Sequence, residues 1–441
     1  MTTYDRPLPR IGPDTAPFWA ATRRGALALP WCADCARPHL PPGPVCPFCF
    51  SDRLAWRDAA GTGVVSTWTR VHKAWFPAFA AELPYTVVQV ELAEGPRLTA
   101  NLIDAGPEGP RVGMRVRAVF DPVTPEVTLP RFRPAPEVLA DSPIAELGEC
   151  PLWDPDSQAL FWIDVVGRRM FRRAAAAGAI ESWALPRLPG SYALRHDGGM
   201  LMAWRNGIGL VDPAAGRFED LPPGPDGPDF ALERLNDGAC DRQGRFWTGT
   251  MARSLRDPVG HLYRVDPDHS VHRMAGGVIL SNGIAWSPDD RTMYHCDSGA
   301  RAVFAHGFDL AAGTLAPRGM FADFTGRPGR PDGCTVDAEG HLWVAAVEAG
   351  ELLRFAPSGA LVACVPLPVS RPTSLAFGDG DLRTLYVTSL RDGLDAAALA
   401  GEPDAGRVFA LRPGVAGLPK PRFEGRTADA ARHRPAALGN L

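Results

Sequence analysis

Lysine is nearly absent from this chain. Only Lys73 and Lys420 occur among 441 residues, and the net charge of −4 reflects a near balance of arginine against acidic side chains. Neither charge-driven disorder nor a general affinity for nucleic acid is therefore expected. The sequence also has no run of about 18 apolar residues, which a membrane-spanning helix needs, and MTTYDRPLPRIGPD at its start lacks the apolar core of a secretory signal. These absences predict a cytoplasmic protein that binds neither membrane nor nucleic acid.

The length and the changing pattern along the chain predict three domains, because 441 residues exceed the usual size of one hydrophobic core. We expect a zinc ribbon in residues 1–54, a small barrel in 55–135 and a repeat domain in 136–441. The proline-rich segment PRFRPAPEVLADSPIAELG joins the barrel to the repeats. Within this joint, PEVLAD is a candidate for an outer strand that closes the repeat domain.

Four of the nine cysteines form one motif, and the other five are scattered singly, which argues against a secreted disulfide framework. Cys32, Cys35, Cys46 and Cys49 have the spacing C-x2-C-x10-C-x2-C. Two such pairs suit tetrahedral Zn²⁺, and four thiolates leave no open position, so the predicted site is structural. His39 lies between the pairs and is expected on a surface loop, since the thiolates already fill the shell.

Short apolar runs separated by glycine and proline follow the cysteines and predict the strands of a small barrel. The order of ribbon and barrel, with VELAEGPRLTANLIDAGPEGPRVGMRVRAVF and TLPRFRPA, resembles the zinc-ribbon plus OB-fold proteins found beside acyl-CoA thiolases and aldolases. That resemblance implies a rubredoxin-like ribbon, an OB-fold and a partner of the acyl-CoA thiolase or aldolase type. An OB barrel can also bind single-stranded nucleic acid, but Trp68, Trp75 and Phe76 beside few arginines make a weak case for it.

Beyond the joint, one pattern recurs six times at spacings of 41 to 50 residues. Each copy contains a short strand, a turn rich in Asp or Gly, and a second strand. A repeat of about 40 to 50 residues built from four short strands is typical of a β-propeller. The sequence therefore predicts an all-β protein with a six-bladed propeller.

The innermost strand of each blade runs along the central channel of a propeller. Aligned by phase, the first channel-facing residues are all polar: Glu149, Ser191, Asn236, Asn282, Asp332 and Thr373. Carboxylates and amides that converge without a ligand would repel one another or stay unsatisfied. Oxygen ligands indicate a divalent cation, Ca²⁺ first, with Zn²⁺, Mn²⁺ or Mg²⁺ as alternatives. The competing interpretation is that these residues only cap the strand ends.

At these positions the sequence resembles the senescence marker protein, regucalcin and gluconolactonase family. The resemblance rests on LGECPLW, RLNDGACDRQGRFWTGTM, LSNGIAWSPDDRTMYHCDS, RPDGCTVDAEGHLWVA and RDGLDAAALAGEPDAGRVFAL. It implies that Glu149, Asn282 and Asp332 bind one divalent metal and that Arg234 and Asn236 contact substrate. The implied reaction is hydrolysis of a sugar-type lactone whose carbonyl is polarised by the ion.

Two positions depart from the family pattern. Cys150 stands where a glycine usually follows the glutamate, and MARSLRDPVGHLYRV lacks the acidic residue that some members carry just after the methionine of GTM. The second departure leaves open which side chains make the polar contacts to substrate.

Asp332 is the candidate general base, because a ligand carboxylate stays ionised and can accept a proton from water. No G-x-S-x-G motif occurs, which disfavours a serine nucleophile. His196, His261 and His295 lie within or beside predicted strands and are expected to be structural. Two other functions share the same residues: a different metal-dependent ester or phosphotriester hydrolase, and a non-catalytic calcium-binding accessory protein of an acyl-CoA enzyme.

Overall fold

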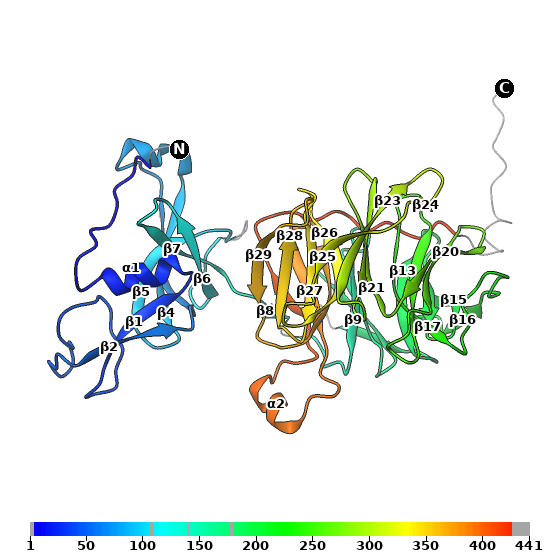
Figure 1. Cartoon of the computed structure of the whole chain (residues 1–441), viewed down its shortest axis with the longest axis horizontal. Helices are drawn as coiled ribbons and strands as arrows, with labels where there is room; N and C mark the ends of the chain where they lie inside the picture. Colours follow the sequence, from blue (N-terminus) through cyan, green and yellow to red (C-terminus); the bar gives the residue numbers. More distant parts are fainter. Residues whose placement is uncertain (1–3, 106–108, 140, 176–179, 426–441) are drawn as a thin grey trace. The chain divides into compact units, whose positions relative to one another are not determined.

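The protein forms two compact units in a computed structural model that describes residues 4–105, 109–139, 141–175 and 180–425 (Figure 1). The first unit comprises Met1–Glu137 and Leu411–Gly414, and the second comprises Val138–Ala410 and Val415–Leu441. Among the described residues, no helix has the length and apolar character needed to cross a membrane.

The first unit begins with a helix and a two-stranded sheet. Helix α1 (Ala16–Arg23) buries Phe18 and Ala21. Strands β1 (Leu27–Cys32) and β2 (Leu54–Ala59) pair antiparallel, and the long excursion between them carries the paired cysteines. Cys32 ends β1, so the sheet fixes the first of the four thiols.

A closed barrel of order β3-β4-β5-β7-β6 completes this unit. Its strands, with a 3₁₀ helix at Pro77–Glu82 between the first two, are β3 (Thr62–Val71), β4 (Tyr85–Leu92), β5 (Arg97–Leu102), β6 (Arg115–Pro122) and β7 (Thr128–Pro134). Val65, Val90, Val116 and Phe132 lie almost fully buried in its core. The predicted barrel and ribbon are both confirmed.

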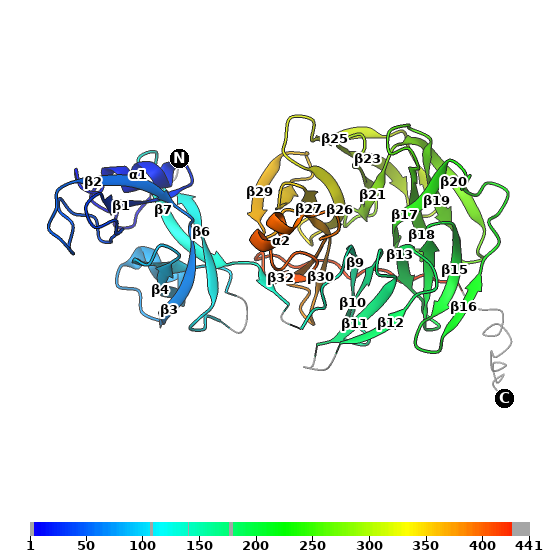
Figure 2. The ribbon, with the colours of Figure 1, turned by 90° about the horizontal axis from the view of Figure 1, so that it is seen from below.

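The second unit is the predicted six-bladed propeller, seen as sheets arranged around a centre in Figure 2. Blade 1 contains β9 (Gly148–Asp154), β10 (Ala159–Asp164), β11 (Arg169–Ala174) and β12 (Glu181–Ala184). Blade 2 contains β13 (Pro189–Leu194), β14 (Met200–Trp204), β15 (Gly207–Asp212) and β16 (Arg217–Asp220). Blade 3 contains β17 (Glu233–Cys240), β18 (Phe246–Ala252), β19 (Gly260–Val265) and β20 (Val271–Val278).

Blades 4 to 6 follow the same plan. Blade 4 contains β21 (Ser281–Trp286), β22 (Thr292–Asp297), β23 (Ala302–Asp309), β24 (Thr314–Leu315) and β25 (Gly319–Asp323). Blade 5 contains β26 (Arg330–Val336), β27 (Leu342–Val347), β28 (Glu351–Phe355) and β29 (Leu361–Pro366). Blade 6 contains β30 (Pro372–Gly378), β31 (Thr384–Ser389), β32 (Phe409–Leu411) and β8 (Glu137–Val138). A short helix, α2 (Ala396–Gly401), precedes β32. Because β8 is the outer strand of the last blade, the expected role of PEVLAD is confirmed.

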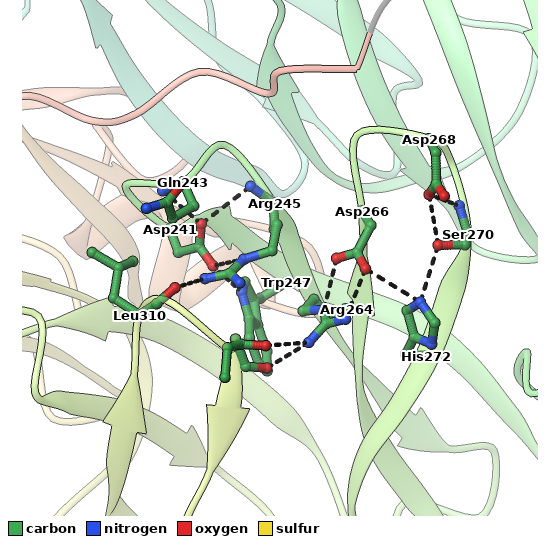
Figure 3. Close-up of polar contacts among 12 residues, drawn as sticks. Asp241, Gln243, Arg245, Trp247, Arg264, Asp266, Asp268, Ser270, His272 and Leu310 are labelled. Carbon is green, nitrogen blue, oxygen red and sulfur yellow. Dashed lines mark hydrogen bonds and ion pairs between the residues drawn. The ribbon is translucent and has the colours of Figure 1, made fainter.

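A buried aspartate organises the turn after the innermost strand in two blades. Asp241 accepts hydrogen bonds from the backbone N–H groups of Gln243 and Arg245 and, at 2.8 Å, from the indole N–H of Trp247 (Figure 3). Asp337 repeats this arrangement with the Trp343 indole at 2.9 Å. The Asp-containing turns of the sequence repeat are therefore bound to the strand that follows them.

Every innermost strand has a register shift near its channel-facing polar residue. The unpaired positions are 150–151, 190, 236–237, 283, 332–333 and 373–374. A bulge of this kind bends the strand and changes the direction of its side chains. The polar residues of the repeat thus sit at points where the backbone is free to turn them toward the channel.

Residues 415–425 cross the opposite end of the channel, and we call this segment the C-terminal strap. Its backbone bonds to the turns of four blades, through Ala338 and Leu382 on one side and through Leu194, Arg195 and Gly244 on the other. Two side chains also anchor the strap to the propeller. Phe423 is fully buried, and Arg422 forms an ion pair with Asp154. The strap therefore lies across the end of the channel away from Glu149 and Asp332.

Candidate active site

The six polar residues at the channel mouth do not form one equivalent ring. Ser191 donates its hydroxyl hydrogen to the backbone oxygen of Asn236 at 2.8 Å, and Thr373 donates to the backbone oxygen of Gly148. These two hydroxyls link neighbouring blades. The prediction that all six converge on one point is therefore wrong for Ser191 and Thr373, because their hydroxyls bond to backbone oxygens of the next blade.

Three carboxylates remain at the centre, and they repel one another. Burial raises the pKa of Glu149 well above its usual value, and the nearby Asp332 and Asp237 raise it further. Burial and Asp237 likewise hold the pKa of Asp332 well above its usual range. Buried acids in this arrangement are unfavourable in the ionised form unless a positive charge lies between them.

A chain of hydrogen-bonded amides extends from the cationic side chain of Arg234. The Asn236 amide donates to the Asn282 side-chain oxygen at 2.7 Å and to the Ser281 backbone oxygen at 2.8 Å. Arg234 donates to the Asn236 side-chain oxygen at 3.2 Å. The Asn282 amide nitrogen donates to the Ser298 hydroxyl at 2.8 Å. This bond orients the Asn282 side-chain oxygen toward the channel side. Because an amide oxygen accepts twice, Asn282 keeps one lone pair for a ligand.

The donor set fits a hard divalent cation. Among the described residues, the only hydrogen bond to the Glu149 carboxylate comes from the Cys150 backbone N–H at 3.2 Å, and none reaches the Asp332 carboxylate. Buried acids are normally satisfied by donors or by a metal. Two underbonded carboxylates and an oriented amide oxygen supply the oxygen ligands that such an ion prefers.

Close packing of adjacent inner strands sets the width of this site. A Cβ atom on Gly283 would lie 2.6 Å from the Asp332 backbone oxygen and 2.8 Å from the Cys334 nitrogen. Only glycine therefore allows blades 4 and 5 to approach so closely beside Asn282 and Asp332.

Sequence reasoning missed Asp237, Lys420 and the strain at Cys150. Asp237 follows Asn236 at the bulge, its pKa is raised by burial, and its Oδ1 lies 3.5 Å from the Cys150 sulfur. Cys150 has φ = 51°, the left-handed region that explains why glycine is usual there. Lys420, on the strap, lines a small cavity of about 40 Å³ together with Asp237 and Cys150. The signal for Lys420 was its rarity as one of two lysines.

The three histidines near strands have structural partners, as expected. His295 lies 2.9 Å from the Ser281 hydroxyl, and burial lowers its pKa to about 3. His261 contacts Glu233 at 3.3 Å, and His196 pairs with Glu424 at 3.0 Å.

The four N-terminal cysteines gather as predicted. Their sulfur atoms lie within 4.8 Å of one another, with Cys32 to Cys49 at 3.5 Å and Cys35 to Cys46 at 3.6 Å. Four ligands at the usual Zn–S distance of about 2.3 Å have sulfurs about 3.8 Å apart, so this group fits Zn²⁺. The backbone N–H of Cys35 contributes most to lowering the pKa of Cys32 to about 7, and a lower pKa favours the thiolate form that binds metal.

His39 is not part of this cluster, but its predicted place on the surface is wrong. The side chain is only 3% exposed, and its Nδ1 lies 3.2 Å from the backbone oxygen of Pro41. The loop between the cysteine pairs folds over the imidazole instead of exposing it.

A propeller with underbonded acids and an oriented amide at one channel mouth defines the class of metal-dependent propeller enzymes. The family model described as SMP-30/Gluconolactonase/LRE-like region matches residues 147–391, more than half of the chain. The chain belongs to this family, and its propeller is a lactonase-type domain.

Individual relatives agree with this assignment. The chain is 39% identical to 6-deoxy-6-sulfogluconolactonase from Pseudomonas putida over 63% of its own length and 95% of the relative. It is 37% identical to regucalcin from Danio rerio, over 64% and 95%. Its structure resembles that of a calcium-binding protein, regucalcin from Agrobacterium tumefaciens, with a TM-score of 0.61, 31% identity and coverage of 66% and 97%.

The first unit matches two further families. Residues 19–55 match the ChsH2 rubredoxin-like zinc ribbon domain, and residues 56–121 match the ChsH2 C-terminal OB-fold domain. The fusion of these domains to a lactonase-type propeller is therefore established by both structure and sequence.

Proposed function

We propose that the propeller hydrolyses a sugar-type lactone with the help of one divalent cation held by Glu149, Asn282 and Asp332. The observation that carries this proposal is a pair of underbonded carboxylates, the buried Asp332 and the partly buried Glu149, beside an oriented amide oxygen. Similarity to the sulfogluconolactonase of Pseudomonas putida supports the substrate class.

A cation held by Glu149, Asn282 and Asp332 would polarise a lactone carbonyl and would favour ionised carboxylates. Asp332 then accepts a proton from the attacking water as the water oxygen bonds to the carbonyl carbon. The ring C–O bond breaks, and the same proton passes to the departing alkoxide, which gives an open hydroxy acid. Arg234 holds substrate oxygens, because it lies at the mouth and its guanidinium presents several N–H donors. Asn236 contacts substrate beside it through its side-chain oxygen.

Calcium is the proposed cation. All three ligand side chains offer oxygen, which Ca²⁺ prefers, and the similar Agrobacterium protein is described as a calcium-binding protein. Zn²⁺, Mn²⁺ and Mg²⁺ remain the alternatives to compare.

The N-terminal unit is proposed to dock an acyl-CoA enzyme of the thiolase or aldolase type in the cytoplasm. Its match to the ChsH2 domains supports this role. So do its exposed aromatics: Trp75 is 70% exposed, Phe76 52% and Trp68 41%. Large exposed aromatic side chains are a common feature of protein interfaces.

The catalytic assignment is tested with Asp332→Asn and Asn236→Ala. Loss of a general base should lower the turnover of Asp332→Asn by about 10² to 10⁴-fold. Asn236→Ala should act mainly by raising KM, because the amide positions substrate. Initial rates of lactone hydrolysis, followed by proton release, separate kcat from KM.

The matched control is Asp323→Asn, which changes an exposed carboxylate on β25 that, within the described part of the chain, accepts from Thr325 in its own turn. Its rates should equal those of the wild type. If Asp332→Asn keeps near-normal turnover while Glu149→Gln abolishes it, Asp332 is only a metal ligand and the base lies elsewhere on the channel mouth.

A further inference from the structure

Three arginines lie side by side at the channel mouth. The backbone oxygen of Arg205 accepts from the N–H of Leu235 at 3.2 Å, and the backbone N–H of Arg253 donates to the oxygen of Leu232 at 2.9 Å. Arg234 lies between these two anchor points on β17. Backbone hydrogen bonds from two different blades therefore bring the arginine side chains to one place.

None of the three guanidinium groups is paired with an acid among the described residues. Arg234 donates to neutral oxygens, the nearest side-chain partner being Asn236 at 3.2 Å. Arg253 donates at 2.9 Å to the backbone oxygen of Phe230 and at 2.9 Å to the Asn206 amide oxygen. No described residue bonds to the exposed Arg205 guanidinium. The cluster therefore carries uncompensated positive charge.

Nearby acids do not neutralise this charge. Glu233, the residue before Arg234, is buried and accepts from Thr250 and from Tyr263 at 2.9 Å. Its side chain is thus used on the other face of β17. Arg187, in contrast, is paired with an acid, Asp220.

The arginines disfavour one another electrostatically. Burial and, after it, the positive charges of Arg205 and Arg253 together lower the pKa of Arg234 to about 10. Like charges gathered without a counterion weaken the folded state, whereas an anionic ligand between them gains three converging donors.

We infer that the substrate is a lactone that carries a second, anionic group, such as phosphate or sulfonate, bound by Arg205, Arg234 and Arg253. This inference rests on the proposed lactonase function and names the substrate class for the same site. The arginine fork matches the oxygens of such an oxyanion in geometry as well as charge.

Arg253 gives the inference its specificity. It directly follows GTMA, at the end of β18, where its charge lies beside Arg234. An acid would accept hydrogen bonds from neutral hydroxyl groups and repel an anion. Arginine reverses both preferences, so the sign of charge at this point selects between neutral and anionic sugar lactones.

The test compares 6-phosphoglucono-δ-lactone, its 6-sulfo counterpart and neutral glucono-δ-lactone as substrates of the full-length protein with Ca²⁺. The anionic lactones should have a kcat/KM at least about 10-fold higher than the neutral one, since one charge-assisted hydrogen bond contributes that much or more. In the double variant Arg205→Gln/Arg253→Gln, this ratio should fall by about 10- to 100-fold.

Arg217→Gln is the matched control. It removes an arginine from the outer strand β16 of the blade that carries Arg205, and among the described residues its charged partner is Asp212. The ratio should be unchanged in this variant. A wild-type enzyme that hydrolyses the neutral lactone at least as well as the anionic ones would overturn the inference and leave the lactonase function intact.

A binding measurement separates the inference from the reaction. Sorbitol 6-phosphate and sorbitol contain no lactone, so calorimetric titration reports recognition alone. Tighter binding of the phosphate, lost in Arg205→Gln/Arg253→Gln, supports the inference even if no lactone is hydrolysed. Equal binding of the two compounds would reject it.

Discussion

Glu149→Gln should stabilise the metal-free protein while removing its response to calcium. The pKa of Glu149 is raised in the folded state by burial and by Asp332 and Asp237. The folded protein therefore holds this proton to a higher pH than the unfolded chain does. Stability of the metal-free protein should fall as the pH rises from the ordinary carboxyl value of about 4.3 through the raised folded value.

The size of the effect follows from the contacts of the site. An underbonded buried polar group costs about 1–3 kcal/mol, and more when charged. Glutamine keeps the shape of Glu149 without the charge, so the melting temperature of the metal-free variant should rise by about 2–10 °C at neutral pH. In the wild type, Ca²⁺ at 100 times its Kd should add about 2.7 kcal/mol, or about 5–10 °C.

Thermal melting followed by tryptophan fluorescence between pH 5 and 8, with chelator or with Ca²⁺, measures both effects. The control is Glu219→Gln, an exposed acid on β16, which should melt and respond to calcium like the wild type. The reasoning is refuted if wild-type melting is insensitive to calcium at every pH and Glu149→Gln lowers the metal-free melting temperature.

Three further outcomes are expected. Protein purified without chelator should contain one zinc that survives mild chelation and is lost in Cys32→Ser, measured by elemental analysis; wild-type protein without zinc would reject the ribbon site. A chain starting at Pro136 should fold and keep lactonase activity, whereas one starting at Ser142 loses β8 and should melt lower. Gly283→Ala should push Asp332 aside and abolish calcium-dependent stabilisation, while Gly319→Ala, which has open space, should not.

Most of the fold could be predicted because it depends on patterns that repeat. The spacing of 41 to 50 residues indicated six blades, and the turn containing Asp337 proved to be the same bonded unit as the turn containing Asp241. The cysteine spacing likewise predicted the group of four thiols.

The arrangement within the site could not be predicted, because it depends on single-residue bulges that leave the repeat unchanged. A bulge in each innermost strand turns Glu149 and Asp332 toward one another while Ser191 and Thr373 bond to backbone oxygens. Asp237 gains its place beside the acids only through such a bulge. The strap was missed for a different reason: its contacts join turns that are far apart in the sequence.

The central claim is that the propeller opens a lactone and needs a divalent cation to do so. The most direct measurement is proton release from a sugar-type lactone by the purified full-length protein, before and after chelation, with Ca²⁺, Zn²⁺, Mn²⁺ or Mg²⁺ added back. The account predicts hydrolysis well above the spontaneous rate, its loss on chelation, and its return with at least one of these ions in wild-type protein but not in Glu149→Gln. A rate that chelation leaves unchanged, or no hydrolysis of anionic or neutral lactones with any of the four ions, would contradict it.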